Sequence, residues 1–223
     1  MKIVFKSTYP KILFLFLSSS IFFIALYFAL YNYTRKVEKQ VHAASNEQFY
    51  IEVNNLLALD TKPITVAINN DSNWDEFVKF IKTRDANWYN ETIGNEKDIY
   101  KVDYLGAYDI DGNFIIRTAS SKIKSMDFVP KQAMIQLNKS GLSKFYMRIP
   151  EGIVEVVGAS IHPSNDPLKN KTKPSGYFFV ARLLDKTFVN NLEKITNSKI
   201  NFTENVGTSD FGEHLTSATV DLN

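Results

Sequence analysis

The chain has 223 residues, of which 26 are Lys or Arg and 24 are Asp or Glu, and its formal charge is +2. This near balance argues against a nucleic-acid-binding protein, and a mean hydropathy of −0.18 excludes a polytopic membrane protein. The sequence has no cysteine, which excludes a disulfide scaffold, a Cys-ligated metal centre and a thiol nucleophile.

The first feature in chain order is an uncharged apolar segment from Ile12 to Tyr31. A helix of this length spans about 30 Å, the thickness of a bilayer core. We therefore predict a cytoplasmic N-terminus over residues 1–11 and a transmembrane signal-anchor helix over residues 12–33. The alternative is a cleaved signal peptide, but its apolar core is usually only about 7 to 15 residues long.

Three lysines and the terminal amine precede this segment, and three basic residues with Glu38 among them follow it, so the charge difference is small. The positive-inside rule then favours, by a small margin, an N-terminus inside the cell. This orientation predicts a single-pass protein of the inner (cytoplasmic) membrane with its C-terminal domain outside the cytoplasm.

Residues 33–60 contain no Gly or Pro and repeat apolar residues at helical spacings, for example Val37, Val41 and Ala44. We expect the helix to continue as a stalk over residues 34–62. The stalk either packs only on its own domain or pairs with a second copy to form a homodimer. Lys62-Pro63 is expected to break the helix, which assigns residues 63–223 to an extracytoplasmic domain.

A second helix is predicted over residues 64–83. The segment from Ser72 to Asp75 has the spacing of a capping box, and Trp74, Phe77, Val78 and Ile81 lie on one apolar face. Asp85 is expected to cap a short turn that Gly94 closes.

From residue 102 the apolar period changes to two, and Asp111-Gly112 and Glu151-Gly152 are turn signals. Hairpins make antiparallel neighbours, so the predicted fold class is α+β, with one antiparallel sheet and a long helix packed on it. The predicted strands cover residues 102–109, 113–117, 144–149, 153–161 and 176–184, with last strands at 200–202 and 215–222. The predicted helices cover residues 130–139, with Ala133, Ile135 and Leu137 inside, and 186–196, capped by Asp185.

Enzyme motifs are incomplete. The run from Gly158 to His162 approaches the Gly-x-Ser-x-Gly nucleophile elbow but ends in His. This leaves an anchored hydrolase acting through Ser160 as a third hypothesis.

Metal-binding motifs are incomplete as well. The run from Asp109 to Asn113 resembles the start of a calcium loop, but Ser120 stands where the bidentate acid is required. His42, His162 and His214 show no ligand spacing. The sequence therefore predicts no catalytic residue, metal or cofactor.

Aromatic residues beside isolated polar groups remain as candidates for the lining of a small-molecule pocket. Packing in the core is the more common role for each of them. They are Trp74, Trp88, Tyr89, Tyr104, Tyr108 and Tyr146.

Four stretches, in this order, resemble the type-four CHASE family of cyclases/histidine-kinases-associated sensory extracellular domains. The resemblance covers about residues 37–202, and His162 departs from the Pro-Ile that the family tends to have. The stretches are Asn70-Asp71-Ser72-Asn73-Trp74-Asp75, Val102 to Asn113, Val157 to Pro163, and Pro174 to Arg182.

This resemblance implies a PAS-like or Cache-like sensory fold outside a bacterial or archaeal membrane, between two spans, reporting to a histidine kinase or a diguanylate cyclase. The matching motif positions suggest five ligand-side candidates, which are Asp71, Trp74, Asp75, Tyr108 and Arg182. No second apolar span precedes Asn223, so we expect either a fragment or a truncated gene product.

The leading hypothesis is therefore a membrane-anchored sensor for a small-molecule ligand of unknown identity, without its output domain. The alternative is an anchored envelope protein that binds a partner protein or a cell-wall polymer without signalling. The Asn- and Lys-rich loop over residues 163–175 would suit the alternative.

Overall fold

The computed structural model describes residues 8–202 and 218–219. The chain divides into two compact units, residues 1–49 and 50–223, and α1 (Thr8–Asp71) contributes to both. In the first unit, the Ser18 and Ser20 hydroxyls donate to the carbonyls of Leu15 (3.0 Å) and Phe16 (2.9 Å), so neither is left unpaired in an apolar medium. Among the described residues, only α1 has the length and composition of a membrane-spanning helix.

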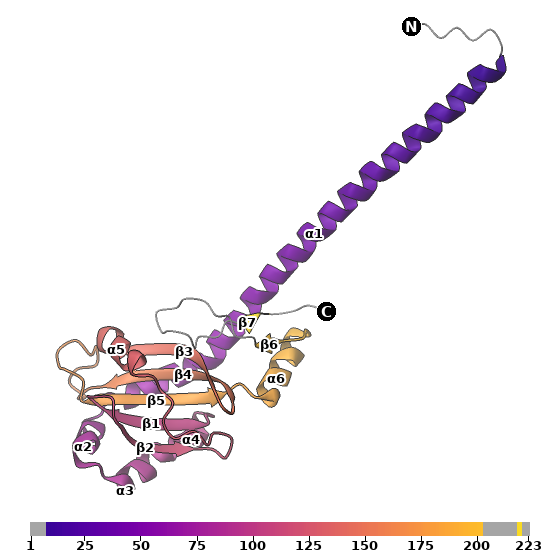
Figure 1. Ribbon diagram of the computed structural model, residues 1–223. Helices are drawn as coiled ribbons and strands as arrows, with labels where there is room; N and C mark the ends of the chain where they lie inside the picture. Colours follow the sequence, from indigo (N-terminus) through magenta and orange to yellow (C-terminus); the bar gives the residue numbers. More distant parts are fainter. Residues whose placement is uncertain (1–7, 203–217, 220–223) are drawn as a thin grey trace. The chain divides into compact units, whose positions relative to one another are not determined.

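The second unit contains a five-stranded antiparallel sheet in the order β2-β1-β5-β4-β3 (Figure 1). This architecture confirms the predicted α+β class. The strands are β1 (Tyr104–Asp109), β2 (Phe114–Ala119), β3 (Leu142–Ile149), β4 (Gly152–Ile161) and β5 (Gly176–Leu183), with a short pair, β6 (Asn201–Phe202) and β7 (Ala218–Thr219). The helices are α2 (Asp75–Thr83), α3 (Ala86–Tyr89), the π-helical turn η1 (Asn90–Gly94), α4 (Glu96–Ile99), α5 (Lys131–Ser140) and α6 (Lys186–Thr196).

The two predicted hairpins, β1–β2 and β3–β4, flank β5, which lies at the centre of the sheet. Phe179 of β5 stands opposite Gly106 on one side and Gly158 on the other. A Cβ atom added to Gly158 would lie 2.3 Å from the ring of Phe179. Glycine at this position therefore makes room for the ring.

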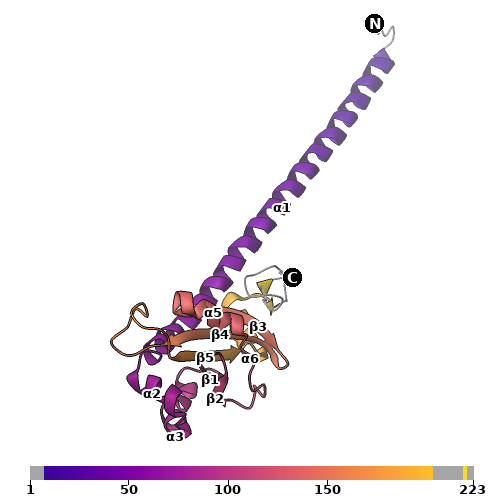
Figure 2. The ribbon, with the colours of Figure 1, turned by 60° about the vertical axis from the view of Figure 1, so that its left-hand side comes forward.

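Both faces of the sheet are buried, which explains why β4 and β5 are apolar at nearly every position. We call the two sides the α2 face and the α5 face; Figure 2 shows the sheet from a second direction. On the α2 face, Leu105, Val157 and Phe178 pack with residues of α1, α2 and α3. On the α5 face, Tyr104, Val156 and Phe179 pack with α5 and with the segment 120–130, which contributes Ile123 and Val129.

The helix break predicted at Pro63 is wrong, because α1 continues through it to Asp71. Ile64 and Ile68 are buried after the proline and Leu57 before it, so burial against the sheet outweighs the lost hydrogen bond. Leu59, whose carbonyl loses its donor, is 65% exposed, so water can replace that donor. The predicted helix over residues 64–83 is accordingly two elements, the end of α1 and α2.

The capping box predicted at Ser72 is also wrong. The N-cap of α2 is Trp74, which makes no side-chain capping bond, and the Ser72 hydroxyl donates instead to the Asn69 carbonyl (3.0 Å). Ser72 is fully buried, and its hydroxyl bonds to the last turn of α1 instead of capping α2.

Helix α5 begins and ends near its predicted limits, but it buries Met134 rather than Ile135, which is 58% exposed.

The predicted caps at Asp85 and Asp185 are confirmed, because both carboxylates accept backbone N–H groups. Gly94 ends η1 rather than a simple turn. Of the strand predicted at 215–222, residues 218 and 219 form β7, and the remainder lies outside the described residues.

Candidate functional site

The five ligand-side candidates do not converge on one site. Tyr108 lies on the α5 face. Asp71, Trp74 and Asp75 lie at the junction of α1 and α2. Arg182 lies near the end of β5, where it pairs with a residue of α1. The three positions are therefore considered separately.

Tyr108 is fully buried. Its hydroxyl lies 3.0 Å from that of Tyr104 and donates to Asp127 (3.0 Å). Burial raises the pKa of Tyr108 above its usual value, and it raises the pKa of Tyr104 to about 12. Both phenols therefore stay protonated, and their hydroxyls are already hydrogen-bonded inside the core.

The residues at the α1–α2 junction make mostly internal contacts. Asp71 is buried and accepts a hydrogen bond from the hydroxyl of Tyr100, and burial raises the pKa of Asp71. Asp75 accepts the Ser164 hydroxyl (2.5 Å) and backbone N–H (3.1 Å), which lower the pKa of its exposed carboxylate. Trp74 is 39% exposed, and Asp75 is exposed as well.

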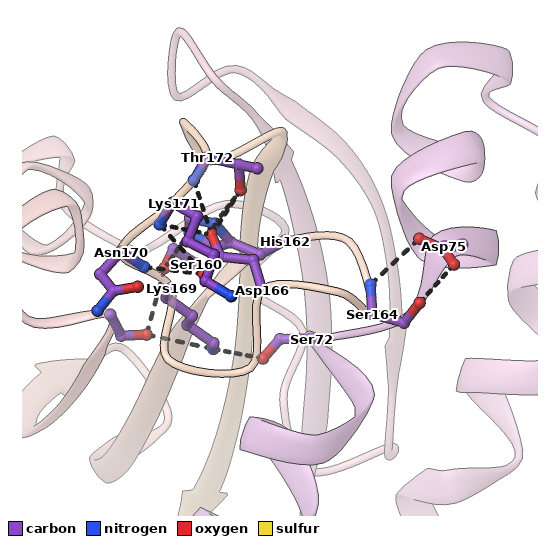
Figure 3. Close-up of polar contacts among 11 residues, drawn as sticks. Ser72, Asp75, Ser160, His162, Ser164, Asp166, Lys169, Asn170, Lys171 and Thr172 are labelled. Carbon is purple, nitrogen blue, oxygen red and sulfur yellow. Dashed lines mark hydrogen bonds and ion pairs between the residues drawn. The ribbon is translucent and has the colours of Figure 1, made fainter.

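Ser160, His162 and Asp166 lie in contact in this order, and the Thr172 hydroxyl also lies 2.9 Å from Nδ1 of His162 (Figure 3). Nε2 of His162 lies 3.1 Å from the Ser160 hydroxyl, and Nδ1 lies 3.3 Å from Asp166. This order is the one that the hydrolase hypothesis requires. However, Ser160 is only 1% exposed, and its own N–H donates to the Gly141 carbonyl (3.1 Å). The arrangement of Ser160, His162 and Asp166 therefore has no accessible nucleophile.

Asp166 organises the loop that follows β4. It accepts the backbone N–H groups of Asn170, Lys171 and Thr172 and the hydroxyl of Thr172. Burial alone would raise the pKa of Asp166, but these hydrogen bonds hold it well below its usual range. The carboxylate is thus an internal acceptor that fixes the loop.

The same loop fastens the end of α1. The His162 N–H donates to the Ser72 carbonyl (2.8 Å), and Nζ of Lys169 donates to the Ser72 hydroxyl (2.7 Å) (Figure 3). Burial lowers the pKa of Lys169 to about 8, and it also lowers the pKa of His162. We interpret the cluster as a structural clamp on the end of α1.

The acidic run at the β1–β2 hairpin forms a turn. Asp109 accepts the backbone N–H groups of Asp111 (3.0 Å) and Asn113 (2.8 Å), and Arg84 pairs with it (3.1 Å). Within the described part of the chain, no group of three or more acidic or histidine side chains is placed to hold a metal ion.

A groove of about 770 Å³ lies between α1 and α6, within the second unit. The apolar part of its lining comes from Leu56 and Leu59 of α1 and from Phe188, Leu192 and Ile195 of α6. Leu59 and Ile195 are each 65% exposed. The charged residues that also line the groove are Asp60, Lys97, Asp98, Lys101, Asp103, Lys122, Arg182 and Asp185.

Arg182 is the only one of the five candidates that lines this groove. Its guanidinium pairs with Asp60 and with Glu155 (2.6 Å), and it lies over the ring of Phe188, 4.7 Å from the centroid. Its buried Nε has no hydrogen-bond partner among the described residues. Such an unpaired buried donor is uncommon and costly.

Glu155 joins α1 to three strands of the sheet. It is 2% exposed and accepts hydrogen bonds from Thr61 (2.5 Å), Lys144 (2.7 Å) and Tyr146 (3.2 Å) in addition to Arg182. Burial alone would raise the pKa of Glu155, but Arg182, Lys144 and Thr61 together keep it below its usual value.

No sequence pattern predicted Glu155, Asp60 or Thr61 as functional residues. For Glu155 a signal was present, because it is the one charged residue in the apolar run from Ile153 to Ile161, and a buried charge needs a partner. Asp60 and Thr61 carry no comparable signal.

The fold and this groove define a class of protein: an α+β domain built on one long helix, with an amphipathic groove beside that helix. The CHASE4 domain family model matches residues 37–203. The chain therefore belongs to the CHASE4 family of extracellular sensory domains, as the resemblance predicted. No match was found among curated proteins.

Among solved structures, the chain is similar to the periplasmic domain of Vibrio cholerae LuxQ. The identity is 12% and the TM-score 0.50, over 78% of this chain and 77% of that one. A second structure of the same domain has 10% identity and a TM-score of 0.48, over 70% and 72%. At these identities the first likeness shows a shared fold.

Proposed function

We propose that the chain is the ligand-sensing part of a membrane-bound receptor of the histidine kinase or diguanylate cyclase type. Its domain would lie outside the inner (cytoplasmic) membrane, and a small-molecule ligand would bind in the groove between α1 and α6. Membership of the CHASE4 family and the candidate membrane-spanning segment of α1 support this proposal.

One observation carries the proposal: a single helix, α1, includes the apolar segment and also lines the groove. Val53, Leu57 and Ile68 of the same helix are buried in the second unit. A ligand that binds one arrangement of α1 on the sheet more tightly than another shifts the balance between them. Shifts of about 1 to 2 Å in a helix are a common form of such signals.

We also propose that the receptor is a homodimer that pairs through the stalk. Val37 and Val41 are exposed on α1 in the first unit, and their spacing suits a helix–helix seam. The alternative of an envelope protein that binds partners through the loop over residues 163–175 has less support, because that loop is tied down by Asp166 and Lys169.

A thermal-shift screen of small molecules on the full chain in lipid nanodiscs tests the sensing proposal. At a concentration of about 100 times its dissociation constant, a ligand stabilises the folded state by about 2.7 kcal/mol. We expect at least one compound to raise the melting temperature by about 5 to 10 °C. If a chemically broad library yields none, the sensing proposal is contradicted.

Two tryptophan substitutions on α6 locate the ligand. Asn191 lines the groove, whereas its neighbour Asn190 lines a different hollow on α6. Asn191→Trp should fill the groove and abolish the thermal shift, and Asn190→Trp should leave it unchanged. A shift that survives in Asn191→Trp would place the ligand elsewhere.

A further inference from the structure

The two partners of Arg182 differ in accessibility. Glu155 is 2% exposed and makes three other hydrogen bonds, whereas the side chain of Asp60 is 51% exposed. The Asp60 carboxylate can leave the guanidinium and become hydrated, whereas Glu155 is enclosed by the protein. Asp60 is therefore the partner that another anion can replace.

The guanidinium of Arg182 is incompletely used in the present arrangement. Glu155 takes Nη2 and Asp60 takes Nη1, and Nε has no partner. A carboxylate can bond to two N–H groups of a guanidinium at once, either on the Nη1–Nη2 edge or on the Nε–Nη2 edge. Nε lies on the edge that Glu155 occupies, so a ligand carboxylate that replaces Asp60 would bond to Nη1 and could also accept the second N–H of Nη2.

Charge and shape around Arg182 restrict the rest of the ligand. Asp60 and Glu155 balance Arg182 and Lys144, so a monoanion that displaces Asp60 keeps this network neutral while Asp60 moves into water. Apolar side chains line the same groove, and the exposed ones of Leu59 and Ile195 offer surface for burial.

We propose that the groove binds small monocarboxylates that carry an apolar tail, and that the ligand carboxylate replaces Asp60 on Arg182. The inference rests on the proposed sensing function and names the ligand class of the same groove. It also gives a mechanism, because two neighbouring residues of α1 bind the buried cluster around Glu155: Asp60 pairs with Arg182, and Thr61 donates to Glu155. Ligand binding removes the contact between Asp60 and Arg182 and thereby favours another position of α1.

The test uses the full chain in nanodiscs, with binding measured by titration calorimetry and corrected with empty nanodiscs. The probes are phenylacetate and octanoate, which separate aromatic acids from acyl-chain acids, and their neutral amides. We expect at least one carboxylate to bind and its amide to bind at least about tenfold more weakly, because the amide lacks the charge.

The decisive variant is Asp60→Asn, which removes the competing anion but leaves Arg182 and Glu155 in place. Competition predicts that it binds the carboxylate about threefold to tenfold more tightly than the unmodified chain. Asp98→Asn is the matched control, because Asp98 is an exposed groove acid that pairs with Lys97 instead of Arg182. It should change the affinity less than about twofold. Arg182→Gln is less informative, since it leaves Glu155 without its main cation.

Equal or weaker carboxylate binding by Asp60→Asn would overturn the inference, as would equal binding of acids and amides. If neither acid binds but the thermal-shift screen yields a neutral ligand, the carboxylate inference falls and the sensing proposal stands. If no compound of any class stabilises the chain, both fall.

Discussion

Replacing Glu155 by Ala is expected to lower the free energy of unfolding by about 3 to 5 kcal/mol. Removing one member of a buried ion pair leaves the other charge desolvated and unpaired. In this chain the loss leaves Lys144 without its acid and Arg182 with Asp60 as its one remaining ion-pair partner among the described residues, and it removes the carboxylate acceptor of Thr61. Urea unfolding of the full chain, followed by circular dichroism, measures the change.

The control for this experiment is Glu52→Ala, an exposed position on the same helix that Glu155 contacts. A surface substitution of this kind usually changes stability by less than about 0.5 kcal/mol. If Glu155→Ala costs no more than Glu52→Ala, then the Glu155 network does not hold α1 on the sheet, and the proposed mechanism loses its basis.

A second large loss is expected for Phe77→Ala, at about 3 to 5 kcal/mol. Phe77 is fully buried on the α2 face, and its ring centroid lies 5.1 Å from that of Phe178 and 5.8 Å from that of Trp88. Truncation removes buried apolar area and leaves a cavity that rigid neighbours cannot fill.

Trp74→Ala provides the comparison, because Trp74 is three residues away but 39% exposed. We expect it to cost about 1 kcal/mol or less, so the two losses should differ by at least about 2 kcal/mol. Equal losses would mean that Trp74, a ligand-side candidate from the sequence, is instead part of the core.

Local signals account for the elements that the sequence predicted well. Asp111-Gly112 set the β1–β2 hairpin, and Asp185 capped α6 as expected, because each depends on a few neighbouring residues. Pro63 shows the limit of such signals. Its local cost is outweighed by the burial of Ile64 and Ile68 against a sheet that is distant in sequence.

The site was harder to predict for the same physical reason. Asp60 and Arg182 are 122 residues apart, and only the folded chain brings α1 and α6 together around a groove. Motif matching selected Arg182, which lines the groove, and Tyr108, which is fully buried. A motif marks where a family places a residue type, but it does not indicate whether the side chain is accessible.

The side of the membrane on which the domain lies is the most direct test of the whole account. Because the sequence has no cysteine, one introduced thiol reports a single position. Lys173→Cys, at an exposed site in the loop after β4, and Lys2→Cys would be treated separately with a membrane-impermeant maleimide on intact spheroplasts. We expect labelling of Lys173→Cys without lysis and of Lys2→Cys only after lysis. Labelling of Lys173→Cys only after lysis would contradict it.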